Sequence, residues 1–147
     1  MYSDRISRQA WLPLGAAFIL AISAFGSYSS IAVAADIKVT LAGDQEVPPV
    51  KSAGTGTGTI IIGADRSVSG SVTTTGIAGT AAHIHEASTG KNGPVIIPLT
   101  KNGDTYAVPA GAKLTDAQFA SFQAGNLYVN AHTKANPDGE IRAQLKP

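Results

Sequence analysis

Beyond residue 35, turn residues break the chain into short segments, and this spacing limits the fold more than any other feature of the sequence. Within the segments, apolar and polar residues alternate, as they do along strands that bury one face. Residues 47–50 include two prolines, which cannot donate hydrogen bonds in a sheet, so we expect an edge or loop segment there. The predicted strands are residues 36–41, 54–62, 67–75, 80–86, 94–99, 106–108, 127–133 and 140–145.

Seven or eight such strands predict an antiparallel sandwich or barrel, in which residues 54–62 and 67–75 form a hairpin. One segment interrupts the strands, because residues 115–124 carry the signals of a short helix. Thr115 stands at the N-cap with Gln118 three residues later, and Gly125 follows where a helix would stop. The class is therefore all-β with one short helix. Two phenylalanines that share a helical face would seal one end of the sandwich, Phe119 and Phe122.

Composition excludes several classes of function. Hydrophobic residues make up 44% of the chain and charged residues only 14%, against about 25% charged in typical soluble domains. Such a chain is too apolar to be disordered and has too few basic residues to hold a phosphate backbone, so nucleic acid is not an expected partner. The absence of cysteine rules out disulfides, thiolate-bound metals and thiol nucleophiles. No Gly-x-Ser-x-Gly elbow or paired-carboxylate motif indicates a hydrolase.

The first 35 residues differ from the rest and are typical of a secretory signal peptide. Arg5 and Arg8 precede an apolar stretch at residues 11–25, and Ala32-Val33-Ala34 offers the small-x-small pattern of a cleavage site. The alternative is a membrane anchor, which needs about 20 apolar residues in succession. We therefore predict a signal peptide at residues 1–35 and one domain at residues 36–147, exported to the periplasm or the extracellular space and free of the membrane after cleavage.

The three histidines of the chain are the most informative residues for function. His83 and His85 alternate with apolar residues in one predicted strand, so both side chains point to the same face. His132 lies on the polar face of another predicted strand. If the two strands are close, three neutral imidazoles can bind one metal ion and leave a coordination position open, which suits copper, with zinc as the alternative. The other interpretation is that these histidines are solvated surface side chains.

Four residues are expected near this cluster. Tyr128 and Asn130 share the face of His132 and could form hydrogen bonds close to the site. Glu86 follows the histidine pair, and it is either a carboxylate that orients an imidazole or a solvated turn residue. Arg142 shares one face of the last strand with Glu140, which is the usual arrangement of a surface ion pair.

Several motifs together resemble the CHRD domain, a family of extracellular modules that is named for chordin and that many bacteria carry as single secreted proteins. The resemblance extends over nearly the whole chain after residue 35, and Ala143 is a small departure because the family usually has glycine there. The motifs are LAGDQEVPPV at 41–50, AAHIH at 81–85 with GKNGPV at 90–95, LYVNAHT at 127–133, and NPDGEIRAQL at 136–145.

A second resemblance concerns the histidines alone. Residues 76–86 are similar to the strand of copper-zinc superoxide dismutase that supplies two copper ligands; His132 would match that family's last copper histidine and Arg142 its active-site arginine. This resemblance implies an immunoglobulin-like Greek-key sandwich. The chain has no fourth histidine to bridge two metals and no zinc ligands between Glu86 and Pro94. The resemblance therefore implies at most a copper-only variant with three ligands and a weak redox activity of the dismutase kind.

Two functions of different classes follow from the sequence. The first is a secreted protein that binds, carries or redox-cycles a copper or zinc ion through His83, His85 and His132. The second is a non-catalytic structural or protein-interaction module, in which the histidines only form hydrogen bonds and the partner is another protein.

Overall fold

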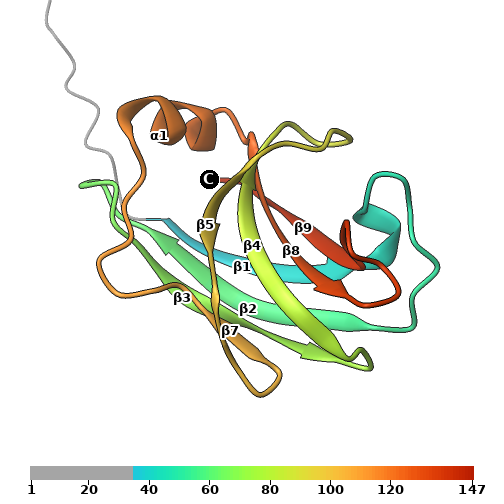
Figure 1. The fold of residues 1–147 in the computed structure, drawn as a ribbon. Coiled ribbons are helices and arrows are strands. Elements are labelled where there is room, and N and C mark those ends of the chain that lie inside the picture. Colours follow the sequence, from blue (N-terminus) through green and yellow to red (C-terminus); the bar gives the residue numbers. More distant parts are fainter. Residues whose placement is uncertain (1–34) are drawn as a thin grey trace, which may run out of the picture. The chain divides into compact units, whose positions relative to one another are not determined.

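The computed structural model describes residues 35–147, and the predicted signal peptide lies outside the described residues except for Ala35. The described residues form an antiparallel nine-stranded sheet with one α-helix and one short 3-10 helix (Figure 1). The predicted all-β class with one short helix is confirmed. The strands are β1 (Ala35–Ala42), β2 (Thr55–Ile62), β3 (Val68–Thr75), β4 (Gly79–Glu86), β5 (Val95–Pro98), β6 (Thr100–Asn102), β7 (Thr105–Ala107), β8 (Leu127–Thr133) and β9 (Ile141–Leu145). The helices are η1 (Gly43–Gln45) and α1 (Asp116–Gln123).

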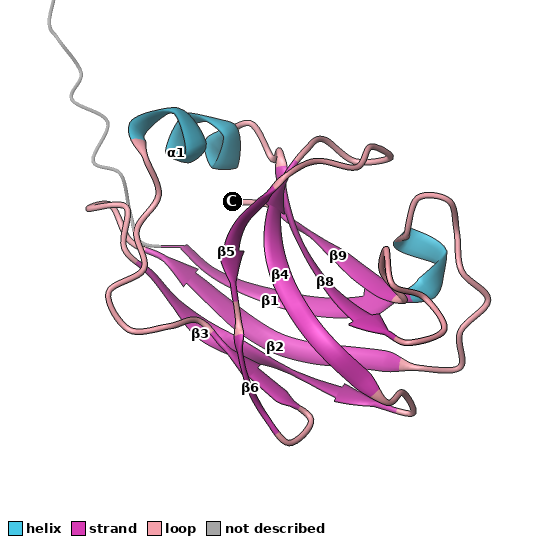
Figure 2. Ribbon diagram, in the orientation of Figure 1, coloured by secondary structure: helices cyan, strands magenta, loops and turns pink. Residues whose placement is uncertain are grey.

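The strands form one sheet that curls until it is nearly closed. Their order is β5-β4-β8-β9-β1-β2-β3-β7-β6, so β5 and β6 are the two edges. Only Leu99 separates these two edge strands along the chain, which brings the two ends of the sheet together. Figure 2 shows the result, with β4 and β5 passing in front of β2 and β3. The two layers of the expected sandwich are therefore parts of one bent sheet.

The strand boundaries agree closely with the alternation in the sequence. The hairpin of β2 and β3 is confirmed, since Thr55 pairs with Thr75 and Ile62 with Val68. Residues 47–50 form a loop, as their prolines indicated. Strand β6 was not predicted, because its three residues are polar and fully exposed and therefore show no apolar alternation.

The short helix begins and ends where the sequence indicated. Thr115 Oγ1 accepts a hydrogen bond from the Gln118 backbone N–H at 3.2 Å, and Gln118 Oε1 accepts one from the Thr115 N–H at 2.9 Å, which completes the capping box. Gly125 follows the helix with a φ of +73°, a conformation that glycine adopts without strain. Phe122 is buried, and Phe119 packs against the core beside it. No helix in residues 35–147 has the length and apolar character needed to cross a membrane.

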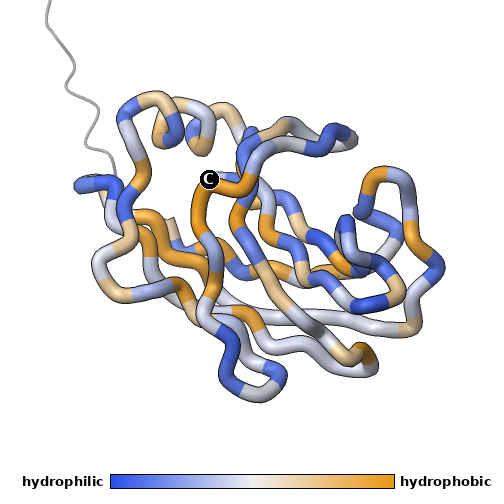
Figure 3. The backbone as a smooth tube through the Cα atoms, viewed as in Figure 1, coloured by the Kyte–Doolittle hydropathy of each residue, from blue (hydrophilic) through white to orange (hydrophobic). Residues whose placement is uncertain are grey.

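The core lies inside the curled sheet, on the side that the apolar residues of each strand share. Figure 3 shows the hydrophobic segments along the strands and most of the hydrophilic segments in the loops. Transfer of this apolar surface out of water is the main term that stabilises a domain without disulfides. The fully buried core side chains include Leu41, Ile60, Val72, Ala82, Tyr106, Leu127, Val129, Ala131, Ile141 and Leu145.

Candidate metal centre

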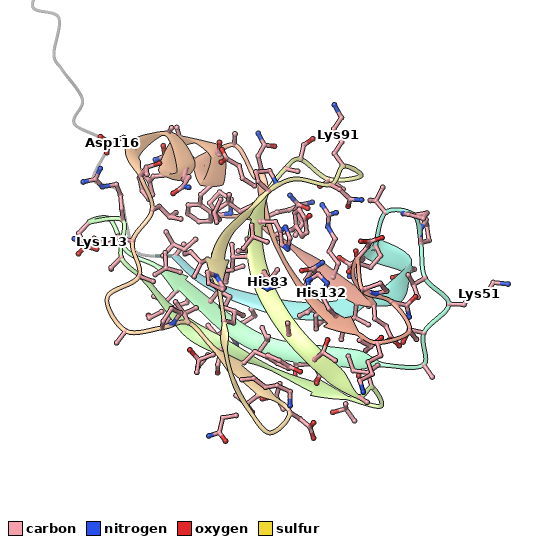
Figure 4. The ribbon with its side chains drawn as sticks, viewed as in Figure 1. Lys51, His83, Lys91, Lys113, Asp116 and His132 are labelled. Carbon is pink, nitrogen blue, oxygen red and sulfur yellow. The ribbon has the colours of Figure 1, made fainter. Side chains whose placement is uncertain are left out.

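The three histidines meet on the face of the sheet opposite the core. Strand β4 pairs with β8 so that Ala81 faces His132 and His83 faces Asn130, and directly opposite residues point to the same side. One ring nitrogen from each of His83, His85 and His132 lies within 4.8 Å of the others. Figure 4 shows His83 and His132 next to each other on these two strands. The structure thus brings together the three side chains that the sequence singled out.

This face is polar, but it is not open to water. Every residue of β8 is buried, on both faces of the strand, and His85 and His132 are only 7% and 8% exposed. The loop at residues 87–94 covers the face from one side, where the Asn92 side chain donates a hydrogen bond to the Val47 carbonyl at 2.6 Å. His85 and His132 are therefore not solvated surface histidines, whereas His83 is half-buried.

Two backbone carbonyls determine which ring nitrogens are free. His85 Nδ1 lies 2.9 Å from the Gly93 carbonyl oxygen, and His132 Nδ1 lies 2.9 Å from the Pro137 carbonyl oxygen. Because a carbonyl only accepts hydrogen bonds, each Nδ1 carries the proton and each Nε2 keeps a lone pair. This is how metal-binding histidines are usually oriented.

The two free Nε2 atoms have different surroundings. His132 Nε2 accepts a hydrogen bond from His83 Nδ1 at 2.9 Å. His85 Nε2 is buried and has no hydrogen-bond partner. Native proteins rarely leave a buried polar atom without a partner, so this nitrogen is where a bound cation fits the structure best.

Burial also sets the protonation of the cluster. Removal from water lowers the pKa of His83, and the charges that His132 and His85 would carry lower it further. Burial likewise lowers the pKa of His85, although the hydrogen bond to Gly93 acts in the opposite direction. Both rings are therefore neutral at neutral pH, which is the form that binds metal.

Tyr128 and Gly93 hold the His85 ring in place. The Tyr128 ring stacks on that of His85 with centroids 4.7 Å apart and planes within 6°. The Tyr128 hydroxyl accepts a hydrogen bond from the Gly93 N–H at 3.3 Å. A Cβ atom at position 93 would overlap the carbonyl oxygen of Glu86, so only glycine allows the loop to approach β4 this closely.

Arg142 lies beneath Tyr128 and not in an ion pair at the surface. Its guanidinium carbon is 3.4 Å from the centre of the Tyr128 ring, and the residue is 1% exposed. The guanidinium also donates to Asn92 Oδ1 at 3.3 Å. The predicted pair with Glu140 is wrong, because the Glu140 carboxylate accepts hydrogen bonds from Ser52 and Thr133 instead. The sequence pattern did not show that a loop covers β9 and encloses Arg142.

Glu86 is not brought to the histidines. It follows His85 by one residue, so its side chain points to the other face of β4. There its carboxylate accepts a hydrogen bond from the Ser121 hydroxyl of α1 at 2.5 Å. The residue anchors the helix to the sheet.

Glu46 is the functional candidate that the residue patterns missed. It follows η1, is only 4% exposed, and its Oε1 atom has no hydrogen-bond partner. Burial raises the pKa of this carboxyl, while the charge of Arg142 and the nearby Asn130 amide lower it. Gly139, with a φ of +138°, makes room for it, because a Cβ there would lie 2.5 Å from Glu46 Oε1 and 2.7 Å from Asn130 Nδ2. The only signal in the sequence was the position of Glu46 within the motif at 41–50.

Fold and site together define a small all-β domain with a three-histidine cluster, of which His85 and His132 are buried and His83 is half-buried. The family model of the CHRD domain matches residues 37–145, and the chain belongs to this family. The resemblance that the motifs indicated is thereby confirmed. No curated protein and no solved structure matches the chain.

Proposed function

We propose that this protein is an exported CHRD-domain protein that binds one copper ion through His83, His85 and His132. The observation that carries the proposal is the buried Nε2 of His85, which has no partner while its Nδ1 is held by a backbone carbonyl. His132 presents its Nε2 in the same way, and His83 faces it through Nδ1. The ligand atoms would be His85 Nε2, His132 Nε2 and one ring nitrogen of His83; if that nitrogen is Nδ1, the proton it shares with His132 moves to Nε2 of the His83 ring when the ion binds.

The donor set favours copper over zinc. Three neutral imidazole nitrogens suit both ions, and among divalent first-row metals copper binds most tightly to a given nitrogen site. A bound copper ion would supply one-electron chemistry, whereas zinc would act only as a Lewis acid. The chain itself contributes an enclosed set of rings whose orientation is fixed before the ion arrives, and we favour metal binding without catalysis.

Export is part of the proposal. The segment at residues 1–35 contains two arginines and one aspartate, which account for the net charge of +1 of the whole chain. Cleavage before Ala35 or Asp36 would leave a domain without net charge whose first strand, β1, starts at the new terminus. Mass spectrometry of the exported protein should show a mature start at Ala35 or Asp36. A full-length chain in the membrane fraction would contradict this part of the proposal.

Calorimetric titration of copper(II) and zinc(II) into the untagged protein tests the metal site. His83→Ala and His132→Ala each remove one of three ligands and should weaken binding by roughly a hundredfold or more, since even residues that only support a ligand account for about tenfold to hundredfold. The core lies on the opposite face of the strands, so circular dichroism should show that both variants stay folded. Thr74→Val is the matched control, because Thr74 is buried and polar but lies on β3, away from the cluster.

One observation favours a second function. His83 and His132 are joined by a direct hydrogen bond, so part of the cluster is satisfied without an ion. In that case the domain would be a structural or protein-interaction module, and the histidines would hold β4 and β8 together. Equal copper affinities of the wild type, both histidine variants and the control would establish this function and overturn metal binding.

A further inference from the structure

Unpartnered buried atoms gather around the cluster. Among residues 35–147, four buried side-chain nitrogen or oxygen atoms have no hydrogen-bond partner. The Tyr106 hydroxyl lies elsewhere, where a Cβ at Gly79 would touch it. The other three belong to the metal centre and its support, and they are His85 Nε2, Asn130 Oδ1 and Glu46 Oε1.

Asn130 occupies the middle of the polar face. It is directly opposite His83 on β4 and directly opposite Arg142 on β9. It also precedes His132 by two residues on the same strand, so the side chains of Asn130 and His132 share a face. Its amide therefore lies between the histidines on one side and the buried side chains of Arg142 and Glu46 on the other.

The surroundings decide which way the amide points. Asn130 Nδ2 lies 3.5 Å from the Asp138 carbonyl oxygen and approaches Glu46 Oε1 in the space that Gly139 leaves open. A carbonyl can only accept hydrogen bonds, so the NH₂ group must face the Asp138 carbonyl. The amide oxygen then lies on the other side of the group, toward the strand face that carries the histidines.

The result is an arrangement of two buried acceptors with no donor between them. His85 Nε2 cannot donate, because its proton is on Nδ1, and an amide oxygen never donates. Two kinds of species satisfy both lone pairs at once, a cation or a water molecule that donates both of its hydrogens. We propose that Asn130 Oδ1 is a fourth ligand of the metal ion, which makes the site a set of three nitrogens and one oxygen, with Glu46 as the residue that orients the amide.

This inference rests on the proposed function and adds a prediction about the ion. An amide oxygen is a hard ligand, so the fourth position favours copper(II) or zinc(II) over copper(I), which prefers soft sulfur ligands. It also means that the position left open by three histidines is filled from within the protein.

Two substitutions at one position test the proposal. Asn130→Leu removes the oxygen at similar volume and should lower copper(II) affinity roughly tenfold to hundredfold, measured by competition with a chromophoric chelator. Asn130→Asp keeps an oxygen at the same place and adds charge, so it should bind copper(II) at least as tightly as the wild type. Its electron paramagnetic resonance spectrum should differ from that of the wild type, because a charged oxygen replaces a neutral one in the coordination sphere. Thr74→Val again serves as the control and should change neither quantity.

The outcomes separate this inference from the proposed function. A folded Asn130→Leu variant with wild-type affinity overturns the fourth ligand while leaving the three histidines in place, and it would indicate that a water molecule bridges the two acceptors. If Asn130→Leu does not fold, the Asn130→Asp variant decides, because an unchanged spectrum overturns the inference. A wild-type protein that binds no copper overturns the proposed function, and the fourth ligand with it.

Discussion

Replacing Gly93 by alanine should damage the proposed metal centre without changing any of the three histidines. The Gly93 backbone makes two contacts at the site, in which its carbonyl accepts from His85 Nδ1 at 2.9 Å and its N–H donates to the Tyr128 hydroxyl at 3.3 Å. A Cβ at this position overlaps the Glu86 carbonyl oxygen, which is backbone of β4 and cannot move aside. The loop must therefore move outward, and both hydrogen bonds stretch or break.

The magnitude follows from these two contacts. Each hydrogen bond contributes about 1 kcal/mol net, so Gly93→Ala should lower the free energy of unfolding by about 2 kcal/mol. For a domain of this size, about 4 °C of melting temperature per kcal/mol gives a decrease of about 8 °C. Copper affinity should decrease roughly tenfold to hundredfold, because the His85 ring loses the carbonyl that fixes its orientation.

Gly90 provides the matched control in the same loop. Its φ is +77°, and a Cβ added there meets nothing within 4 Å. Gly90→Ala should therefore cost roughly 1 kcal/mol through its left-handed backbone and leave copper affinity unchanged. Thermal unfolding of the metal-free proteins and copper titration compare the two variants. Equal copper affinities of Gly93→Ala and Gly90→Ala would refute the idea that this loop orients His85.

Three further predictions concern the scaffold. Phe122→Ala should lower the free energy of unfolding by about 3–5 kcal/mol in urea titration, because the buried ring leaves a cavity under α1, and a loss below 1 kcal/mol would contradict its core role. Thr115→Ala should cost about 1 kcal/mol in the same assay, since the capping box loses its hydroxyl, whereas no loss would mean that the cap adds nothing. Hydrogen bonds from Thr133 and Ser52 hold the pKa of Glu140 below its ordinary value of 4.5, so its contribution to stability is present above pH 4.5 and is lost as the pH falls through the lowered pKa. The wild type should therefore lose more stability than Glu140→Gln below pH 4.5, and parallel stability curves would contradict this.

The strands and the helix could be predicted because each carries its own local signal. Along β1, Ile37, Val39 and Leu41 alternate with exposed polar residues, and the buried face follows directly from that period. Strand β6 lacks such a signal, since it is held at the edge of the sheet by backbone pairing with β7 and buries no side chain. Alternation of apolar and polar residues reflects the burial of one face of a strand. An exposed edge strand buries neither face, so its sequence does not alternate.

Of the candidate site, only the three histidines could be predicted from the sequence. The alternation of polar and apolar residues around His83, His85 and His132 placed the three rings on polar strand faces. The pairing of β4 with β8 brings these rings together. The carbonyls that orient two of the rings come from loops at Gly93 and Pro137, whose paths have no periodicity from which to predict them. The same loops bury the polar face of β8. The strand's own sequence, in contrast, predicts a half-exposed strand.

The contacts of the residues around the three histidines could not be predicted from the sequence, for a related reason. Arg142 and Glu140 alternate correctly along the last strand, but their partners lie far away in the chain, at Asn92 and Ser52. Glu46 depends on the space left by Gly139, which is distant in sequence. Local sequence patterns do not show which distant segments of the chain will enclose a side chain.

The separation of the ligands along the chain has a consequence for the order of events in the life of the protein. His83 and His132 meet only when β4 pairs with β8, and they are 49 positions apart in sequence. Closing so long a loop is slow compared with local structure, so the complete site exists only in the folded domain. If the protein binds copper as proposed, an unfolded chain would offer at most the two histidines of β4 and would hold the ion weakly. Metal capture would then wait until folding has finished, and the ion would stabilise the native state alone, as does any ligand that binds the folded form and not the unfolded one.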